Sequence, residues 1–464
     1  MRGTSMTLGA WTMRRWVAVL AVSLGVAVGV AAQELPRATD LPGKPFFLKK
    51  TWVIGGEGDW DYLTLDPDAM RLFIAHGPSV QVVDVNAGAL AGQINGLRDA
   101  HAIALDDVGM LGFISDGGAN RVRIFDRHSL EITASAPTGP NPRAIVYEPL
   151  TKLVFAICSQ PVTDAVLEQL AEDEDEPQKT TRRAARQANA SGGQNAGRRQ
   201  TASAANESQH GAQHGSQQQT ETISVVSVID SSNNKTLGHL LLAGHLGYAL
   251  TDERGEVYID IPDRNRVAHF NAQTALSALQ QRAAANQAET VPVVDWTGLK
   301  RHDGDAPETH VETLRLGAEC RGPKGMAIDG EQLRLFVACE NQKLQVLNTG
   351  TGNVVTTLTI GPGVDAIGYD ASRGLIYTAN GGGVGSVTVI RRDVADSYAV
   401  IQEVPTKQRA RTLAVNSSNG DVYLVTGLEG YDLSKPGTGG GAHTLPVTKA
   451  SPVPGAFQVL VVGN

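Results

Sequence analysis

The amino-acid sequence predicts an all-β chain folded as a seven-bladed β-propeller. A phrase of about 40 residues recurs along nearly the whole chain. Each copy has an apolar run that ends in an acidic or amide residue, a short turn, a second β-rich run, and a third run similar to Val-x-Val-x-Asp. Repeats of this length that contain four short strands are typical of propeller blades. The apolar runs begin at Tyr62, Ala102, Ala144, Tyr248, Met326, Ala366 and Thr412.

The residue that ends each apolar run tests how regular the repeat is. Asp66 and Asp106 are 40 residues apart, which is one normal period. Glu148 and Asp252 are 104 residues apart, and Asp252 and Asp329 are 77 apart. The excess length in these two intervals predicts one insertion in blade 3 and another in blade 4.

The two insertions differ in composition. Residues 161–222, in blade 3, are rich in Gln, Ala, Ser, Asn and Gly, and they contain too few apolar residues to order themselves, so a disordered segment is predicted. Residues 275–309, in blade 4, begin with a helix-favouring composition, and Val291–Trp296 is a candidate for a short added strand.

The last blade is one strand short. Residues 430–454 are rich in Gly and Pro, and they leave only one terminal strand, at Phe457–Val462. The N-terminal run Phe46–Ile54 has no other blade to join. Because a ring closed by one strand from each end of the chain leaves fewer exposed sheet edges, this run is predicted to complete blade 7. The propeller is therefore expected to span residues 46–464.

The first 32 residues have the organisation of a secretory signal peptide. Arg14 and Arg15 precede an apolar run, and small residues at the end of that run offer a cleavage site before Gln33. The alternative is a retained membrane anchor, for which the run is short. With residues 33–45 as a linker, the mature protein is expected in the periplasm or secreted, without a stable membrane span.

Composition and motifs exclude several classes of function. The formal net charge of −8 argues against the large basic surface that nucleic acid needs. The sequence has no Gly-x-Ser-x-Gly elbow, no His-Glu-x-x-His and no phosphate-binding loop. The chain is therefore expected to be non-catalytic.

Three cysteines occur, Cys158, Cys320 and Cys339. Cys320 and Cys339 flank a predicted hairpin whose turn lies midway between them, which would set them opposite each other on neighbouring strands. A disulfide between these two is expected in an exported protein, and two free buried thiols are the alternative.

Several strands carry a family signature. The second-strand sequence Ile376–Asn380 reads Ile-Tyr-Thr-Ala-Asn, and Leu72–His76 and Leu335–Cys339 follow it more loosely. The third-strand ends Val82–Asp84 and Val228–Asp230 also match. Together these motifs resemble the YVTN-repeat (YncE-like) β-propellers of exported bacterial proteins. The resemblance implies the fold and no single activity. Some similar proteins are described as DNA-binding, so nucleic acid enters as a partner by resemblance only.

A ring of polar residues is expected around the mouth of the central channel. In a propeller blade, the loop that enters the innermost strand and the loop that leaves the second strand lie on the same face. Polar groups at these positions are expected to form a hydrogen-bonded network or to face water. The candidate ligand-binding residues are Asp61, His76, His101, Asp116, Arg143, Lys324, Asp365, Asn380 and Arg411.

Two interpretations of this ring are open. Arg143, Lys324 and Arg411 are suited to bind a carboxylate or phosphate of a small ligand or a protein partner. Alternatively, the balanced acids and bases form a charge network that holds the blades in register. We expect an exported monomer that binds a ligand or partner at this mouth. A lactonase-like or metal-dependent hydrolase at the same pocket is the alternative from another class.

Four ring residues are also acceptable metal ligands, but no cofactor is predicted. The repeat, rather than the geometry of a metal site, sets their spacing. They are Asp61, His76, His101 and Asp116.

Overall fold

The computed structural model describes one compact part of the chain, within Leu35–Asn464. Most of the predicted signal peptide, linker and blade 3 insertion lies outside the described residues. The described residues are 44–163, 222–285, 291–298, 310–431 and 450–464, with Val166, Leu167 and Leu170 and without positions 57, 395 and 454.

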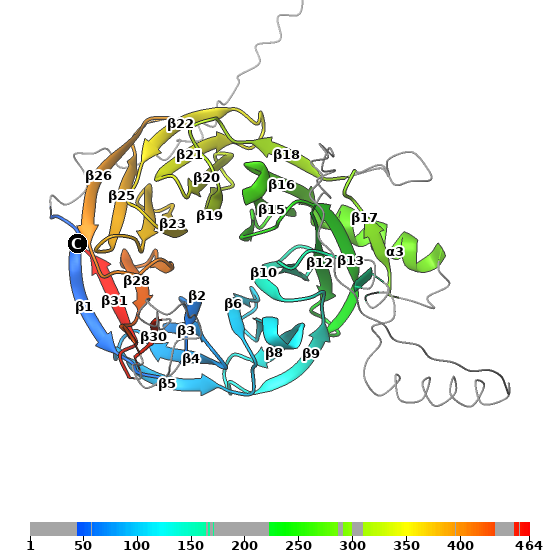
Figure 1. Ribbon diagram of the computed structural model, residues 1–464, viewed down its shortest axis with the longest axis horizontal. Coiled ribbons are helices and arrows are strands. Elements are labelled where there is room, and N and C mark those ends of the chain that lie inside the picture. The colour runs from blue at the N-terminus through cyan, green and yellow to red at the C-terminus, as the bar shows by residue number, and fades with distance from the viewer. Residues whose placement is uncertain are drawn as a thin grey trace, which may run out of the picture. The chain divides into compact units, whose positions relative to one another are not determined.

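Seven sheets surround a common axis as the blades of a propeller (Figure 1), which confirms the predicted fold. Blade 1 contains β2 (Trp60–Asp66), β3 (Arg71–His76), β4 (Ser79–Asp84) and β5 (Ala89–Ile94). Blade 2 contains β6 (Ala100–Leu105), β7 (Leu111–Asp116), β8 (Arg121–Asp126) and β9 (Ile132–Pro137). Blade 3 contains β10 (Pro142–Glu148), β11 (Leu153–Cys158), β12 (Ile223–Asp230) and β13 (Lys235–Ala243). Blade 4 contains β14 (Ala249–Thr251), β15 (Glu256–Ile261), β16 (Arg266–Asn271) and β18 (Glu312–Arg315). Blade 5 contains β19 (Pro323–Asp329), β20 (Arg334–Cys339), β21 (Lys343–Asn348) and β22 (Val354–Thr359). Blade 6 contains β23 (Val364–Asp370), β24 (Leu375–Asn380), β25 (Ser386–Arg392) and β26 (Tyr398–Pro405).

Blade 7 is built from both ends of the propeller. Its strands are β27 (Leu413–Asn416), β28 (Asp421–Thr426), β31 (Gln458–Gly463) and β1 (Phe47–Val53). The outer strand β1 pairs antiparallel with β31, and β31 pairs with β28. The predicted closure by the N-terminal strand is confirmed. A small separate hairpin, β29 (Glu429–Tyr431) with β30 (Ala450–Pro452), lies between β28 and β31 in the chain.

The insertion that follows β16 reinforces the neighbouring blade. It contains helix α3 (Ala272–Ala285) and strand β17 (Val293–Asp295), where composition predicted a helix and an added strand. β17 pairs in parallel with β13, so it adds a fifth strand to blade 3 although the chain leaves and re-enters blade 4. Leu279 of α3 and Trp296 are buried in the core shared by these blades. The insertion therefore ties two blades together.

The repeated acidic residues have a local structural role. Asp66 at the end of β2 accepts hydrogen bonds from the backbone N–H groups of Asp68 and Ala69, at 3.2 and 3.0 Å. Asp84 at the end of β4 accepts the N–H of Ala87 at 3.0 Å. Short acidic side chains stabilise tight turns in this way. The acidic residues therefore recur with the period of the tight turns that they cap.

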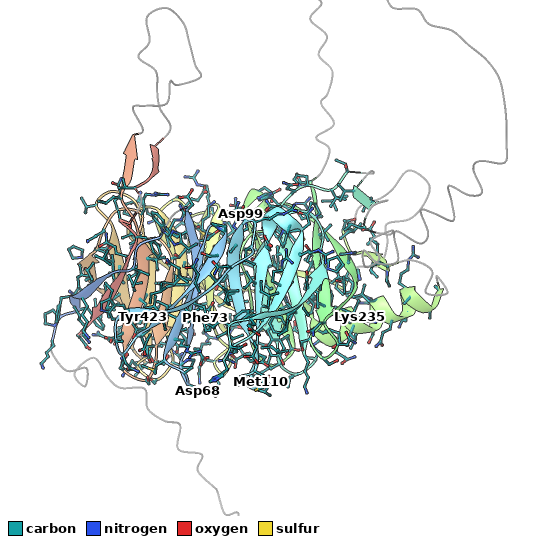
Figure 2. The ribbon with its side chains drawn as sticks, turned by 90° about the horizontal axis from the view of Figure 1, so that it is seen from below. Asp68, Phe73, Asp99, Met110, Lys235 and Tyr423 are labelled. Atoms are coloured by element: carbon teal, nitrogen blue, oxygen red, sulfur yellow. A yellow bond between two sulfur atoms is a disulfide. The ribbon has the colours of Figure 1, made fainter. Side chains whose placement is uncertain are left out.

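The turns between first and second strands mark one face of the ring, and the loops that enter the first strands mark the other. Figure 2 shows Asp68 and Met110 on the former, the turn face, and Asp99 on the latter, the entry face. On the turn face, the buried Arg127 of blade 2 pairs with Asp66 of blade 1 and, at 3.2 Å, with Asp106. Buried ion pairs thus connect neighbouring blades.

Cys320 and Cys339 form a disulfide. The strand register differs from the expected one, because Cys339 lies opposite Pro323. Cys320 precedes β19, and the disulfide joins a loop to β20 instead of joining two opposed strand positions. The third cysteine, Cys158, is free and buried.

Candidate functional site

Side chains from three successive blades meet at the entry face. Asp61 on β2 accepts a hydrogen bond from His101 Nδ1 at 2.9 Å and another from Arg143 Nη2 at 3.4 Å. His101 Nε2 lies 3.1 Å from Asp99 Oδ2, without the geometry of a hydrogen bond. In the described part of the chain, neither ring nitrogen meets a serine or cysteine. His101 is thus held by carboxylates and is not paired with a nucleophile.

Two further predicted basic residues have acidic partners nearby. Arg411 Nε lies 2.9 Å from Asp365 Oδ2, across the boundary between blades 7 and 6. Lys324 Nζ lies 2.9 Å from Glu340 Oε1 within blade 5. Aligning the repeats did not select Glu340, because the alignment stopped one residue earlier, at Cys339. Each of the predicted basic residues therefore has one carboxylate partner.

These pairs belong to one electrostatic group, which we call the axial cluster: Asp61, His101, Arg143, Lys324, Asp365 and Arg411. Burial raises the pKa of the Asp365 carboxyl above its usual value. The charges that also act on it come from four other blades and belong to Arg411, Asp61, Lys324 and Arg143. The repeat thus brings its polar inner-strand residues together around the axis.

Aromatic side chains fill the axis beside this cluster. The rings of Tyr62 in blade 1 and Tyr248 in blade 4 lie 5.4 Å apart, and these blades are not neighbours. The contact therefore crosses the ring, and the expected central channel is not open at this level. Burial raises the pKa of Tyr248 to about 12, with a smaller effect from Asp260. Burial also raises the pKa of Tyr62 well above its usual value, so both phenols are neutral at physiological pH.

Three predicted ring residues have partners outside the axial cluster. The ring of His76 lies 4.2 Å from that of Phe457 in blade 7. Asp116 accepts a hydrogen bond from Arg123 Nε on the third strand of its own blade at 3.1 Å. Asn380 hydrogen-bonds within blade 6. Strand side chains project from the two faces of a sheet, and second strands do not border the axis. The contacts described for these three residues do not reach the charged residues described above, and their role in ligand binding stays a prediction.

The structure gives no support to the metal alternative. Among the residues that the structure describes, no group of three or more His, Cys, Asp or Glu side chains is arranged to hold a metal ion. Of the four proposed ligands, His76 packs against Phe457 of blade 7 and Asp116 pairs with Arg123 of its own blade. The described helices also include none with the length and apolar character that a membrane crossing requires.

The sequence analysis missed three residues beside the axis: Tyr62, Tyr248 and Asp260. The two tyrosines lie four residues before the residue that ends the inner run, where the other copies have alanine, glycine or threonine. A bulky aromatic residue at a position that is otherwise small is a signal in the sequence. Asp260, on β15, gives a similar signal, because the matching positions of the other second strands hold alanine, serine, isoleucine or valine.

Asp260 is fully buried beside Tyr248. Its Oδ1 accepts the backbone N–H of Tyr248 at 2.9 Å, and its Oδ2 has no hydrogen-bond partner among the described residues. Burial raises the pKa of this carboxyl well above its ordinary value of 3.8, and the hydrogen bond from the Tyr248 N–H and the nearby Lys324 charge offset this only in part. Burial therefore favours the neutral acid over the carboxylate.

Replacement of Asp260 by asparagine is expected to stabilise the protein at neutral pH. The unfolded carboxyl ionises near pH 3.8, whereas the folded carboxyl keeps its proton to higher pH. Wild-type stability is thus lost as pH rises through this window, and asparagine cannot ionise. Urea unfolding at about pH 4 and about pH 7 measures the effect. The prediction would be contradicted if the wild type were equally stable at both pH values. It would also be contradicted if the variant were less stable than the wild type at neutral pH.

Comparison with known proteins identifies the fold and not a family. No protein-family model and no curated protein matches the sequence. The structure titled "Crystal structure of RRP9 WD40 repeats" matches with a TM-score of 0.53 and 9% identity, over 93% of this chain and 99% of that chain. The chain shares the seven-bladed propeller fold of WD40-repeat proteins.

Two further solved structures match the same fold. The structure of U3-55K matches with a TM-score of 0.52 and 8% identity, over 92% of this chain and 99% of that chain. A chain of the mitotic checkpoint complex matches with a TM-score of 0.52 and 10% identity, over 91% of this chain and 95% of that chain. At these identities the likeness concerns the fold alone.

Proposed function

We propose that this protein is a non-catalytic binding propeller that holds a carboxylate or phosphate group of a ligand or partner protein at the entry end of its axis. One observation carries the proposal: the basic side chains of the axial cluster are its most exposed members. Arg143, Lys324 and Arg411 are 51%, 37% and 37% exposed. Asp61 and Asp365, which pair with the two arginines, are 13% and 26% exposed. Glu340, which pairs with Lys324, is 61% exposed, so the two arginines are the cations that are more exposed than their carboxylate partners.

The three cations are placed to act together. They come from blades 3, 5 and 7, so an anion on the axis is approached from separated directions. Burial lowers the pKa of Lys324, but the hydrogen bond and charge of Glu340, with Asp365 and Asp260, outweigh this and raise it overall. The ammonium is charged at neutral pH. Charge-assisted hydrogen bonds from such groups are stronger than neutral ones, and arginine binds carboxylates and phosphates through two parallel bonds.

Citrate and pyrophosphate are suitable probes, titrated by calorimetry at constant ionic strength. We expect wild-type binding and about tenfold weaker binding for Arg143→Ala or Arg411→Ala, a loss of about 1.4 kcal/mol each. Lys235→Ala is the matched control, because Lys235 is an exposed cation on β13, the fourth strand of blade 3 (Figure 2). Arg143 is half exposed, so its removal costs little stability.

Two outcomes overturn this proposal. The first is a wild-type protein that binds neither anion. The second is unchanged affinity in a folded Arg143→Ala, Arg411→Ala double variant that has lost stability, which would assign the axial cluster to holding the blades in register.

The proposal includes export to the periplasm or beyond. Residues 1–32 have the organisation of a signal peptide, and Ile376–Asn380 belongs to the motifs that resemble exported YVTN-repeat propellers. The Cys320–Cys339 disulfide supports the same compartment, because disulfides persist in oxidising environments. The intact mass of protein expressed in a secreting bacterial host tests this. A mature chain that begins elsewhere than Gln33, or that retains the N-terminal segment, would count against cleavage at the expected site.

A further inference from the structure

Exposed apolar side chains gather on the entry face at blades 6 and 7. Val384, in the loop between β24 and β25, is 82% exposed. Leu428, which follows β28, and Val453, which follows β30, are 61% and 38% exposed. The N–H of Val453 donates to the carbonyl of Leu428 at 2.8 Å, so these two residues lie side by side. Single exposed apolar residues are ordinary, whereas grouped ones often mark binding surfaces.

Backbone hydrogen bonds join the loops that carry these residues. The N–H of Arg409, in the loop before β27, donates to the carbonyl of Gly381 at 2.8 Å and ties this loop to the Val384 loop. The hydroxyl of Thr426 at the end of β28 donates to the carbonyl of Gln408 at 2.7 Å. The Val384 and Leu428 loops are therefore connected through residues 408 and 409.

The connecting loop presents two cations. Lys407 Nζ donates to Gln458 Oε1 at 2.6 Å and has no acidic partner among the described residues. The guanidinium of Arg409 lies 4.4 Å from the ring centroid of the buried Trp60, and its Nη2 is 3.3 Å from Asp59 Oδ1. Stacking on an indole holds a guanidinium in place without removing its charge. Two oriented cations thus lie between two exposed apolar loops.

We propose that this surface, the rim patch of Val384, Lys407, Arg409, Leu428 and Val453, docks a short acidic peptide segment of a partner protein that also carries apolar side chains. Carboxylates of the segment pair with the two cations, and its apolar side chains cover the valines and leucine. A second copy of this chain fits poorly through the same patch, because a symmetric contact would bring like charges together. Nucleic acid supplies anions but no apolar side chains. The rim patch shares no residue with the axial cluster, so this proposal is independent of the proposed function.

Fluorescence anisotropy with three labelled synthetic peptides tests the rim patch. The first alternates leucine with aspartate and glutamate; the second replaces leucine by serine; the third replaces the acids by their amides. We expect binding of the first peptide only, and about tenfold weaker binding by Val384→Ser, Leu428→Ser and Lys407→Gln variants. All three positions are at the surface, so these variants are expected to fold. Lys235→Ala should bind the peptide as the wild type does, because Lys235 is exposed and belongs to neither the rim patch nor the axial cluster.

Three results overturn the proposal. They are equal binding of all three peptides, wild-type affinity in the rim-patch variants, and binding of vesicles of anionic and zwitterionic phospholipid without binding of the first peptide. The last result would assign the patch to a membrane surface. Because citrate binding is tested with variants of the axial cluster and peptide binding with variants of the rim patch, failure of one proposal leaves the other testable.

Discussion

Replacement of Arg127 by alanine is expected to destabilise the propeller by about 3–5 kcal/mol, the loss typical of breaking a buried ion pair from one side. Arg127 is buried on the turn face between blades 1 and 2. Its guanidinium contacts the carboxylate of Asp66, pairs with that of Asp106 at 3.2 Å, and donates to the Asp106 carbonyl at 2.9 Å. Without it, two buried carboxylates lose their counter-charge.

Urea unfolding with Arg391→Ala as control measures this effect. Arg391 pairs with Asp393 at 2.7 Å, and both side chains are partly exposed, so its loss should cost at most about 1 kcal/mol. Asp66→Asn and Asp106→Asn introduced together with Arg127→Ala should restore part of the stability, because asparagine is neutral and still caps the turns. An Arg127 effect as small as that of the control would refute the proposed role.

Removal of the disulfide has the second largest expected effect. Cys320 and Cys339 are 19 residues apart in sequence, and closing a loop of this length in the unfolded chain stabilises the fold by about 3 kcal/mol. Cys320→Ser with Cys339→Ser should lower the free energy of unfolding by this amount. The disulfide also lies next to Glu340, the partner of Lys324.

The control for this prediction is a reducing agent. Reductant should destabilise the wild type to the level of the double serine variant and leave that variant unchanged. Equal stability of the oxidised wild type and the variant would show that the disulfide contributes nothing measurable. Chevron analysis of the two proteins separates effects on folding and unfolding rates.

The propeller fold and its closure could be predicted from the amino-acid sequence. Asp66 and its counterparts recur at a fixed period because each caps a tight turn, and that interaction reaches only two or three residues along the chain. Short-range requirements of this kind leave a pattern that can be read without a structure. The N-terminal strand could also be assigned from the sequence, because the repeat left blade 7 one strand short.

The contacts between side chains at the axis follow from packing between blades. The contact between Tyr62 and Tyr248 joins blades 1 and 4, and it exists because the ring closes. The direction of the Asp116 and His76 side chains depends on the sheets beside them, and the pairing of β17 with blade 3 depends on a free sheet edge there. Such contacts join residues far apart in the chain, and no local pattern records them. The blades and the six residues of the axial cluster could therefore be predicted from the sequence. The pairing among those residues, the contact between Tyr62 and Tyr248, and the rim patch depend on packing between blades.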